Sequence, residues 1–107
     1  MKYIKKFENI KKIPEVGDYV IIRWELNNLA HFLNNNIGQI AYKSPDNSVF
    51  TVKYDNIPNN IKNHFVSPGS LSKDRRLSKS FNLKEILHFS KDIKELELEL
   101  TANKYNL

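Results

Sequence analysis

The sequence contains no cysteine, which excludes disulfide bonds, thiolate nucleophiles and cysteine-ligated zinc sites. Only three glycines occur in 107 residues, so there is no glycine-rich loop to hold a phosphate. No apolar run approaches the roughly 18 residues of a membrane-spanning helix, and the first residues lack the apolar stretch of a signal peptide. We therefore expect a cytoplasmic protein with no membrane association, stabilised by packing alone.

Positive charge is present, but it is confined to two short segments. Residues 1–12 carry five lysines and one glutamate, a net charge of +4, and residues 73–79 carry four basic residues and one aspartate, a net charge of +3. Since the whole chain has a net charge of +5, the remaining residues sum to −2. Asparagine, isoleucine and lysine are abundant, which indicates an AT-rich genome and weakens the basic composition as a functional signal.

Three runs are typical of β-strands. Tyr19–Trp24 is rich in β-branched and aromatic residues and follows a turn at Gly17. Residues 37–43 and 49–54 alternate between apolar and other residues on either side of the turn-forming segment 44–48. These two runs therefore predict a β-hairpin.

Helices are expected near residues 26–35, near 58–65 and from about 91 to 104. In the first, Leu26, Leu29 and Leu33 fall on one helical stripe. The second begins at Pro58, a residue that suits the first turn of a helix. The third has Ser90 as a candidate N-cap and an acidic residue in its first turn, although its alternating leucine and glutamate residues also suit a strand.

Two segments are harder to interpret. Residues 67–80 combine proline, glycine, serines and charge without periodicity, so we expect a loop or a ragged hairpin there, and the most mobile part of the chain. Residues 81–89 satisfy neither the helical nor the strand period cleanly. We favour a turn at 82–84 and a closing strand at 85–89.

The runs Gly17–Ile22, Ile37–Ile40 and Phe50–Tyr54 together resemble the first three strands of SH3-like small barrels of the KOW and Tudor kind. In those barrels a glycine-aspartate element opens the first strand and a glycine element opens the second. Gly17 and Gly38 stand at these places, where they would permit tight turns. The resemblance covers roughly residues 16–55. Because such barrels serve in RNA, DNA, peptide and purely structural roles, it indicates a fold more than a function.

This resemblance implies a mainly β fold with α additions, in which a five-stranded SH3-like barrel carries short inserted helices and a C-terminal helix. We expect one domain over residues 1–107. Its parts are a basic lead-in at 1–13, the barrel at 14–90, and the C-terminal helix and tail at 91–107.

The whole chain, from its MKYIKKFE opening to its FSKDIKELE helix start, also resembles short proteins of tailed bacteriophages with AT-rich genomes. That resemblance implies expression in the cytoplasm of a bacterial host. An accessory or anti-defence role that acts on a host protein follows as one functional hypothesis.

The residues that usually carry catalysis or bind metal show no useful spacing. The three histidines are His31, His64 and His88, and they fall in three different predicted elements. The acidic residues that follow or precede strands are Asp18, Asp46 and Asp55, and each suits a turn better than a catalytic pair. We therefore expect no enzymatic activity, no metal and no cofactor.

Nucleic-acid binding is the sharper hypothesis. Its candidate phosphate contacts are Lys73, Arg75, Arg76 and Lys79, and its candidate base-stacking residues are Tyr42 and Tyr54. Arginine suits phosphate because the guanidinium group can donate two parallel hydrogen bonds. The alternative is that residues 73–79 form a solvated loop whose charge only keeps the protein soluble.

A protein partner is the third possibility. The C-terminal helix would display Leu98 opposite Ile93, Leu96 and Leu100, which gives more apolar surface than one barrel can cover. A homodimer or a host protein would use this surface. Alternatively, Leu98 packs under the N-terminal segment, in which Tyr3, Ile4, Phe7 and Ile10 form one apolar helical face with the lysines on its wet side. The oligomeric state does not follow from the sequence.

Overall fold

The structure is a computed structural model that describes residues 13–26, 28–67 and 73–105, the last three of these by their backbone only. Its elements in chain order are β1 (Tyr19–Ile22), α1 (Leu29–Asn35), β2 (Gly38–Lys43), β3 (Phe50–Tyr54), the 3-10 helix η1 (Asn59–His64), β4 (Leu77–Phe81), the 3-10 turn η2 (Leu83–Glu85), β5 (Ile86–Ser90) and α2 (Ile93–Tyr105). None of the helices within the described ranges is both long and apolar enough to cross a bilayer.

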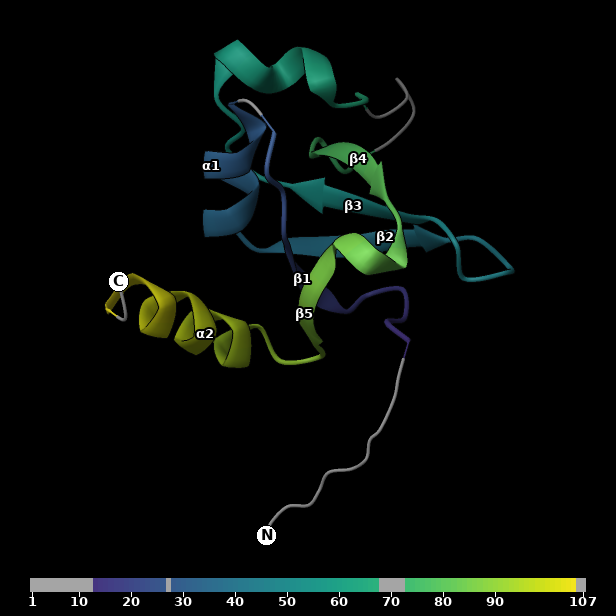
Figure 1. The fold of residues 1–107 in the computed structure, drawn as a ribbon. Coiled ribbons are helices and arrows are strands. Elements are labelled where there is room, and N and C mark those ends of the chain that lie inside the picture. Colours follow the sequence, from purple (N-terminus) through teal and green to yellow (C-terminus); the bar gives the residue numbers. More distant parts are fainter. Residues whose placement is uncertain (1–12, 27, 68–72, 106–107) are drawn as a thin grey trace, which may run out of the picture.

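The five strands form one antiparallel sheet in the order β4-β3-β2-β1-β5. The two edge strands, β4 and β5, are consecutive in the sequence and are separated only by Asn82 and η2. So short a connection keeps the end of β4 close to the start of β5, which requires the sheet to curl (Figure 1). No ladder joins these two described strands, so the curled sheet is open between them.

The inner face of the sheet carries the hydrophobic core. Along β3, Phe50, Val52 and Tyr54 are buried, and the residues between them are only partly covered, as the two-residue period of a strand requires. Leu33 of α1 and Ile61 of η1 pack into the same core cluster. Residues of these two helices also line one groove, and in the view of Figure 1 α2 lies below α1.

Side chains fill the space where the sheet is open. Arg23 donates its backbone N–H to the carbonyl of Glu85 at 2.8 Å, which brings the chain after β1 beside η2. Trp24 then meets Phe81, the last residue of β4, edge to face with ring centroids 5.6 Å apart. This aromatic contact therefore links the end of β4 to the chain after β1, which itself lies beside η2 at the start of β5.

A second, smaller apolar contact lies on the outer face of β1 and β5, where α2 packs. Ile21 and Leu96 are 1% and 2% exposed, yet neither belongs to the main core cluster. The helix begins after Asp92, whose Oδ1 accepts the backbone N–H of Lys94 at 2.9 Å. The predicted helix is therefore confirmed, but its expected cap is wrong, because Asp92 supplies the capping oxygen in place of Ser90.

Most predicted elements are present with shifted bounds. The strand predicted at Tyr19–Trp24 ends at Ile22, and the predicted hairpin is β2 and β3. The helix predicted from residue 26 begins at Leu29, so Leu26 lies outside it and is 64% exposed. The closing strand predicted at 85–89 is β5.

The segment 67–80, predicted as a loop or a ragged hairpin, ends in a strand. Residues 77–80 belong to β4, which pairs with β3 along its whole length, from Phe50 opposite Phe81 to Tyr54 opposite Leu77. A further bridge joins Val66 to Ser78. The sequence of β4 did not indicate a strand, because serine and lysine occupy its centre. The predicted segments 1–12 and 68–72 lie outside the described residues.

The two glycines singled out in the sequence have different roles. Gly17 has a φ of +96°, a left-handed conformation that favours glycine in a turn, as predicted. The reason given for Gly38 is wrong, since Gly38 lies buried within β2 and its φ is not positive. A Cβ at Gly38 would lie 2.3 Å from Cγ1 of Val52 and 2.8 Å from Cζ of Tyr54, so packing requires glycine there.

Candidate nucleic-acid interface

A groove of about 880 Å³ opens where β3 ends and β4 begins. Four basic residues and two acidic residues line it, which are Lys62, Lys73, Arg75, Arg76, Asp55 and Asp74. These side chains give the groove a net charge of +2 from its described lining. Three segments distant in the sequence therefore converge here, namely the end of β3, η1 and the residues before β4.

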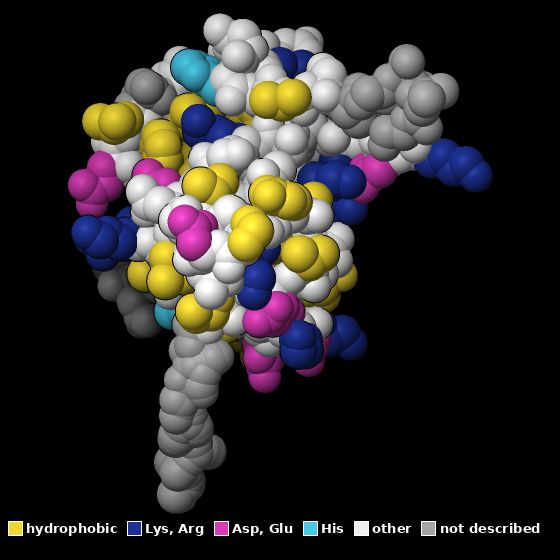
Figure 2. All heavy atoms as spheres, turned by 90° about the vertical axis from the view of Figure 1, so that its right-hand side faces the viewer, with side chains coloured by type: hydrophobic (Ala, Val, Ile, Leu, Met, Phe, Trp, Pro, Cys, Tyr) yellow, Lys and Arg dark blue, Asp and Glu magenta, His cyan; other side chains and the backbone are white. Residues whose placement is uncertain are grey.

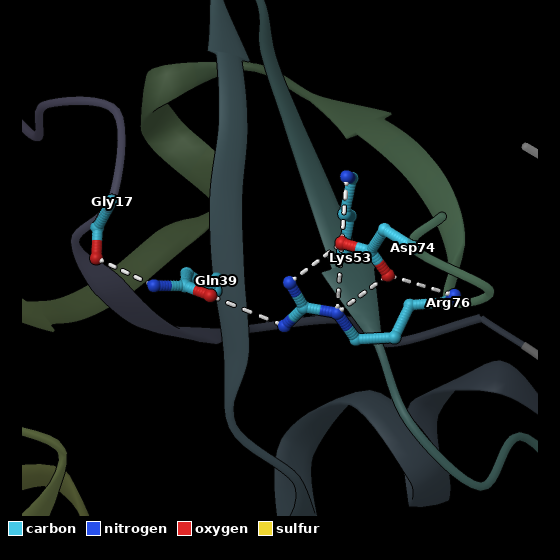
Figure 3. Close-up of polar contacts among 5 residues, drawn as sticks. All are labelled: Gly17, Gln39, Lys53, Asp74 and Arg76. Carbon is cyan, nitrogen blue, oxygen red and sulfur yellow. Dashed lines mark hydrogen bonds and ion pairs between the residues drawn. The ribbon is translucent and has the colours of Figure 1, made fainter. Parts of the chain in front are cut away.

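Asp74 lies at the centre of a polar cluster beside the groove (Figure 3). Its carboxylate accepts Nη2 of Arg76 at 2.8 Å, the backbone N–H of Arg76 at 3.0 Å and Nζ of Lys53 at 2.8 Å. Arg76 Nη1 also donates to Oε1 of Gln39 at 3.1 Å, and Nε2 of Gln39 donates to the carbonyl of Gly17 at 3.1 Å. This chain of contacts ties the residues before β4 to β3, to β2 and to the turn before β1.

The charges in this cluster stabilise one another. Hydrogen bonds from the Arg76 and Lys53 side chains hold the pKa of Asp74 well below the ordinary value for a carboxyl group. The Asp74 carboxylate in turn raises the pKa of Arg76. Asp74 is therefore ionised at any physiological pH, and Arg76 is a fixed cation whose charge is largely balanced by its partner.

The four residues predicted to contact phosphate differ in their exposure and in their contacts. Lys73 and Arg75 are exposed and line the groove, as the binding hypothesis requires. Arg76 also lines the groove, but its side chain is 30% exposed and held by Asp74 and Gln39. Its role is therefore at least partly structural, which the sequence did not indicate.

Lys79 does not lie on a basic loop, so that prediction is wrong. It belongs to β4 and pairs opposite Val52, so its side chain starts on the core side of the sheet. Its Nζ lies 5.2 Å from the ring centroid of Trp24 and 5.8 Å from that of Phe81. Lys79 thus covers the aromatic contact at the open side of the sheet with its aliphatic stem and ammonium group.

The two tyrosines proposed for base stacking also differ in their exposure. Tyr42 is 54% exposed on β2, opposite Thr51 of β3. Tyr54 is 2% exposed and packs edge to face against Phe32 and Phe65, with ring centroids 5.3 Å and 6.0 Å away. The prediction that Tyr54 is available for stacking is therefore wrong, and burial raises the pKa of its hydroxyl.

The outer face of β2, β3 and β4 adds polar groups that the sequence reasoning missed. Register places Gln39, Lys53 and Ser78 in one cross-strand row and Tyr42, Thr51 and Ser80 in the next. The hydroxyls of Thr51 and Ser80 lie 3.2 Å apart. The alternation in β3 already pointed to this face, since the residues between its buried positions are a threonine and a lysine. The bulge in β2 after Ile40, by contrast, gave no signal in the sequence.

Positive charge is not gathered into one continuous area on the face that Figure 2 presents. Lysine and arginine side chains appear there in several separate places, with acidic and hydrophobic side chains between them. Binding by broad electrostatic attraction alone is therefore a poor description of this surface. Any nucleic-acid contact would depend on a few placed cations together with an exposed ring and hydroxyls.

The residues considered for catalysis and metal binding lie apart. Among the residues that the structure describes, no group of three or more histidine or acidic side chains could hold a metal ion. His31 and His64 are exposed on helices, and His88 lies on β5 with Nε2 3.5 Å from Oε2 of Glu99. Asp18 is more than a turn residue, because it is 5% exposed and its carboxylate accepts Nζ of Lys91 at 3.1 Å.

Comparisons with protein-family models, with curated proteins and with solved structures found no match for this chain. Its own side chains are therefore the basis for a functional proposal. The outer face of β2, β3 and β4 and the adjoining groove are where exposed cations, hydroxyls and an exposed tyrosine lie together.

Proposed function

We propose that the chain is a non-enzymatic binding module built on an SH3-like small barrel of the KOW and Tudor kind. Three features support the barrel: five antiparallel strands, a sheet curled enough that its edge strands are joined through η2, and side chains that fill the open side. In this proposal the contact between Trp24 and Phe81 closes the barrel in place of a fifth set of backbone hydrogen bonds.

The proposed ligand is single-stranded nucleic acid, bound across the outer face of β2, β3 and β4. The supporting observation is that Lys73 and Arg75 stand exposed at a groove whose wall is held by Asp74 and Arg76, next to a sheet face that carries exposed Tyr42. Proteins that bind single strands combine cations that follow the backbone with aromatic rings on which bases stack. This surface offers both kinds of group.

Each group has a distinct role in this proposal. Lys62, Lys73 and Arg75 contact phosphates at the groove, where their charges are exposed. Tyr42 stacks on a base, and the hydroxyls of Thr51 and Ser80 accept or donate hydrogen bonds beside it. The Asp74 and Arg76 pair positions the residues before β4 and touches the ligand less than its exposed neighbours do.

A salt titration tests this proposal. Fluorescence anisotropy with labelled RNA and DNA oligonucleotides of mixed sequence should detect binding at low salt. With three phosphate contacts, log K should fall against log salt with a slope of about −2 for a single strand. Absence of binding to both oligonucleotides at low salt would overturn the proposal, and stronger binding to duplex than to single strands would exclude the stacking role of Tyr42.

The alternative is a phage accessory or anti-defence protein that binds a host protein and no nucleic acid. Exposed apolar side chains on β5 and α2, such as Leu87 and Leu98, favour this alternative. Capture of the tagged protein from a lysate of its native host, with and without nuclease, separates the two. A captured protein that survives nuclease treatment supports the alternative, whereas nuclease-sensitive capture supports nucleic acid.

A further inference from the structure

A small groove with both apolar and polar lining lies between β5 and α2, away from the proposed nucleic-acid face. Its volume is about 360 Å³, and Phe89, Leu96 and Leu98 contribute its apolar lining. Leu98 is 71% exposed, Leu87 of the same strand is 44% exposed, and Ile93 of the same helix is 36% exposed. So much apolar surface on two neighbouring elements is typical of a site that another segment covers.

The groove is bordered by acidic groups. Glu95 and Glu99 line it, and Glu97 is exposed on the same helix. The two lining carboxylates are held in place, because Glu95 accepts the hydroxyl of Ser90 and Glu99 lies 3.5 Å from Nε2 of His88. An occupant that suits this groove therefore combines apolar side chains with positive charge.

We propose that the groove is the docking site of residues 1–12 of the same chain. This segment has a net charge of +4, and its apolar residues are Tyr3, Ile4, Phe7 and Ile10, at spacings that place them on one face of a helix. Apolar side chains of the segment would enter the groove beside Leu98, while its lysines face the glutamates. Charge and apolar pattern match on both sides.

The place where the described chain begins is compatible with this docking. Tyr19 pairs with Ser90 at the end of β5, and Asp18 bonds Lys91 at 3.1 Å, so the chain before β1 enters beside the connection from β5 to α2. Twelve residues can span up to about 40 Å when extended and about 18 Å as a helix. The segment therefore has ample length to reach Leu98 from residue 13.

The absence of cysteine permits a direct test on the full chain. A nitroxide spin label on Lys6→Cys, which lies on the polar side of the segment, should broaden the amide signals of Leu87 and Leu98 in an isotope-labelled protein. The same label on Ser48→Cys, in the exposed turn after β2, is the matched control and should leave those two signals unchanged.

The signal broadening should also depend on the side chains that line the groove. Leu98→Glu should reduce the broadening to the level of the Ser48→Cys control, and because Leu98 is mostly exposed, this change should leave the fold intact. Leu26→Glu, at another exposed leucine, should have no effect. High salt should weaken the broadening, since the lysines and glutamates are then screened.

Two results would overturn the proposal. If the label on Lys6→Cys leaves Leu87 and Leu98 unaffected, the segment does not dock there, and the surface is free for another protein. If broadening appears only when labelled and isotope-labelled chains are mixed, the occupant belongs to a second copy. Both results are independent of nucleic-acid binding, because neither the groove nor the segment belongs to that proposed surface.

Discussion

Gly38 and Tyr54 pack so closely that a methyl group cannot fit between them, since a Cβ at Gly38 would lie 2.8 Å from Cζ of Tyr54. The same Cβ would be 2.3 Å from Cγ1 of Val52, a contact that real atoms do not make. Because all three residues are buried within paired strands, neither ring nor strand can move away cheaply. The close pairing of β2 and β3 therefore depends on glycine at this position.

Gly38→Ala should lower the free energy of unfolding by about 1–3 kcal/mol, the usual cost of overpacking a core. Urea denaturation followed by circular dichroism measures this change. Adding Val52→Ala should recover part of the loss, because it removes the Cγ1 atom that collides with the new methyl group. If the two changes are simply additive, the steric explanation is wrong.

Tyr54→Phe should leave the free energy of unfolding unchanged or raise it by about 1 kcal/mol. The Tyr54 hydroxyl is buried and finds no hydrogen-bond partner among the residues that the structure describes, so its removal relieves a buried polar group without disturbing the ring contacts with Phe32 and Phe65. Thermal unfolding of the two proteins provides the comparison. A clear loss of stability would mean that the hydroxyl has a partner, such as a bound water, and oligonucleotide affinity should stay unchanged in either case.

Asp74→Asn should make the free energy of unfolding less dependent on pH in the acidic range. The pKa of Asp74 is lowered in the folded state, so its contribution is present above the unfolded value of about 3.9 and is lost as pH falls below it. The stability difference between the natural protein and Asp74→Asn should therefore shrink between about pH 5 and pH 2.

Urea denaturation at a series of pH values measures this difference. Asp55→Asn is a suitable control, because Asp55 lines the same groove, whereas the side-chain hydrogen bonds of Arg76 and Lys53 go to Asp74. A difference for Asp74→Asn that stays constant down to pH 2 would contradict the assigned ion pair.

Arg75→Ala and Arg76→Ala should have different consequences, although the two residues are adjacent. Arg75 is exposed, so its loss should weaken oligonucleotide binding about fivefold at low salt, reduce the salt slope by about 0.7 and leave the melting temperature unchanged. Arg76 holds Asp74 and Gln39, so its loss should lower the melting temperature by about 3 °C. Equal effects of the two changes on melting temperature would refute this division.

Tyr42→Ala should weaken binding to single strands by about tenfold, in line with the loss of one stacked base. Tyr42→Phe keeps the ring and should bind like the natural protein. Because Tyr42 is 54% exposed, neither change should alter the melting temperature by more than about 2 °C. Anisotropy titrations of the three proteins give the comparison, and equal affinities for all three would remove Tyr42 from the interface.

Local sequence patterns predicted β1 and the hairpin of β2 and β3, because their β-branched residues and apolar alternation can be recognised alone. They also predicted β5 and α2, although neither segment has a clean period. They missed β4, since Ser78, Lys79 and Ser80 read as loop residues and the strand exists through its pairing with β3. For the candidate site, composition correctly singled out Lys73, Arg75 and Tyr42 as exposed.

Register explains why the remaining site residues could not be predicted. Tyr54 and Lys79 differ in character, yet pairing places both on the core side of the sheet, where one is buried and the other covers Trp24. A shift of one residue would have turned both outwards. The contact of Arg76 with Gln39 spans 37 residues, so no local pattern could indicate it.

By itself, the sequence determined most of the strands and helices and where charge is concentrated, because these properties depend on neighbouring residues, whereas β4 depends on its pairing with β3. Only the tertiary structure decided which tyrosine faces water, which arginine is held by an aspartate and how the open side of the sheet is filled. The physical reason is that burial and ion pairing depend on the register between strands, which is set by the packing of the whole core.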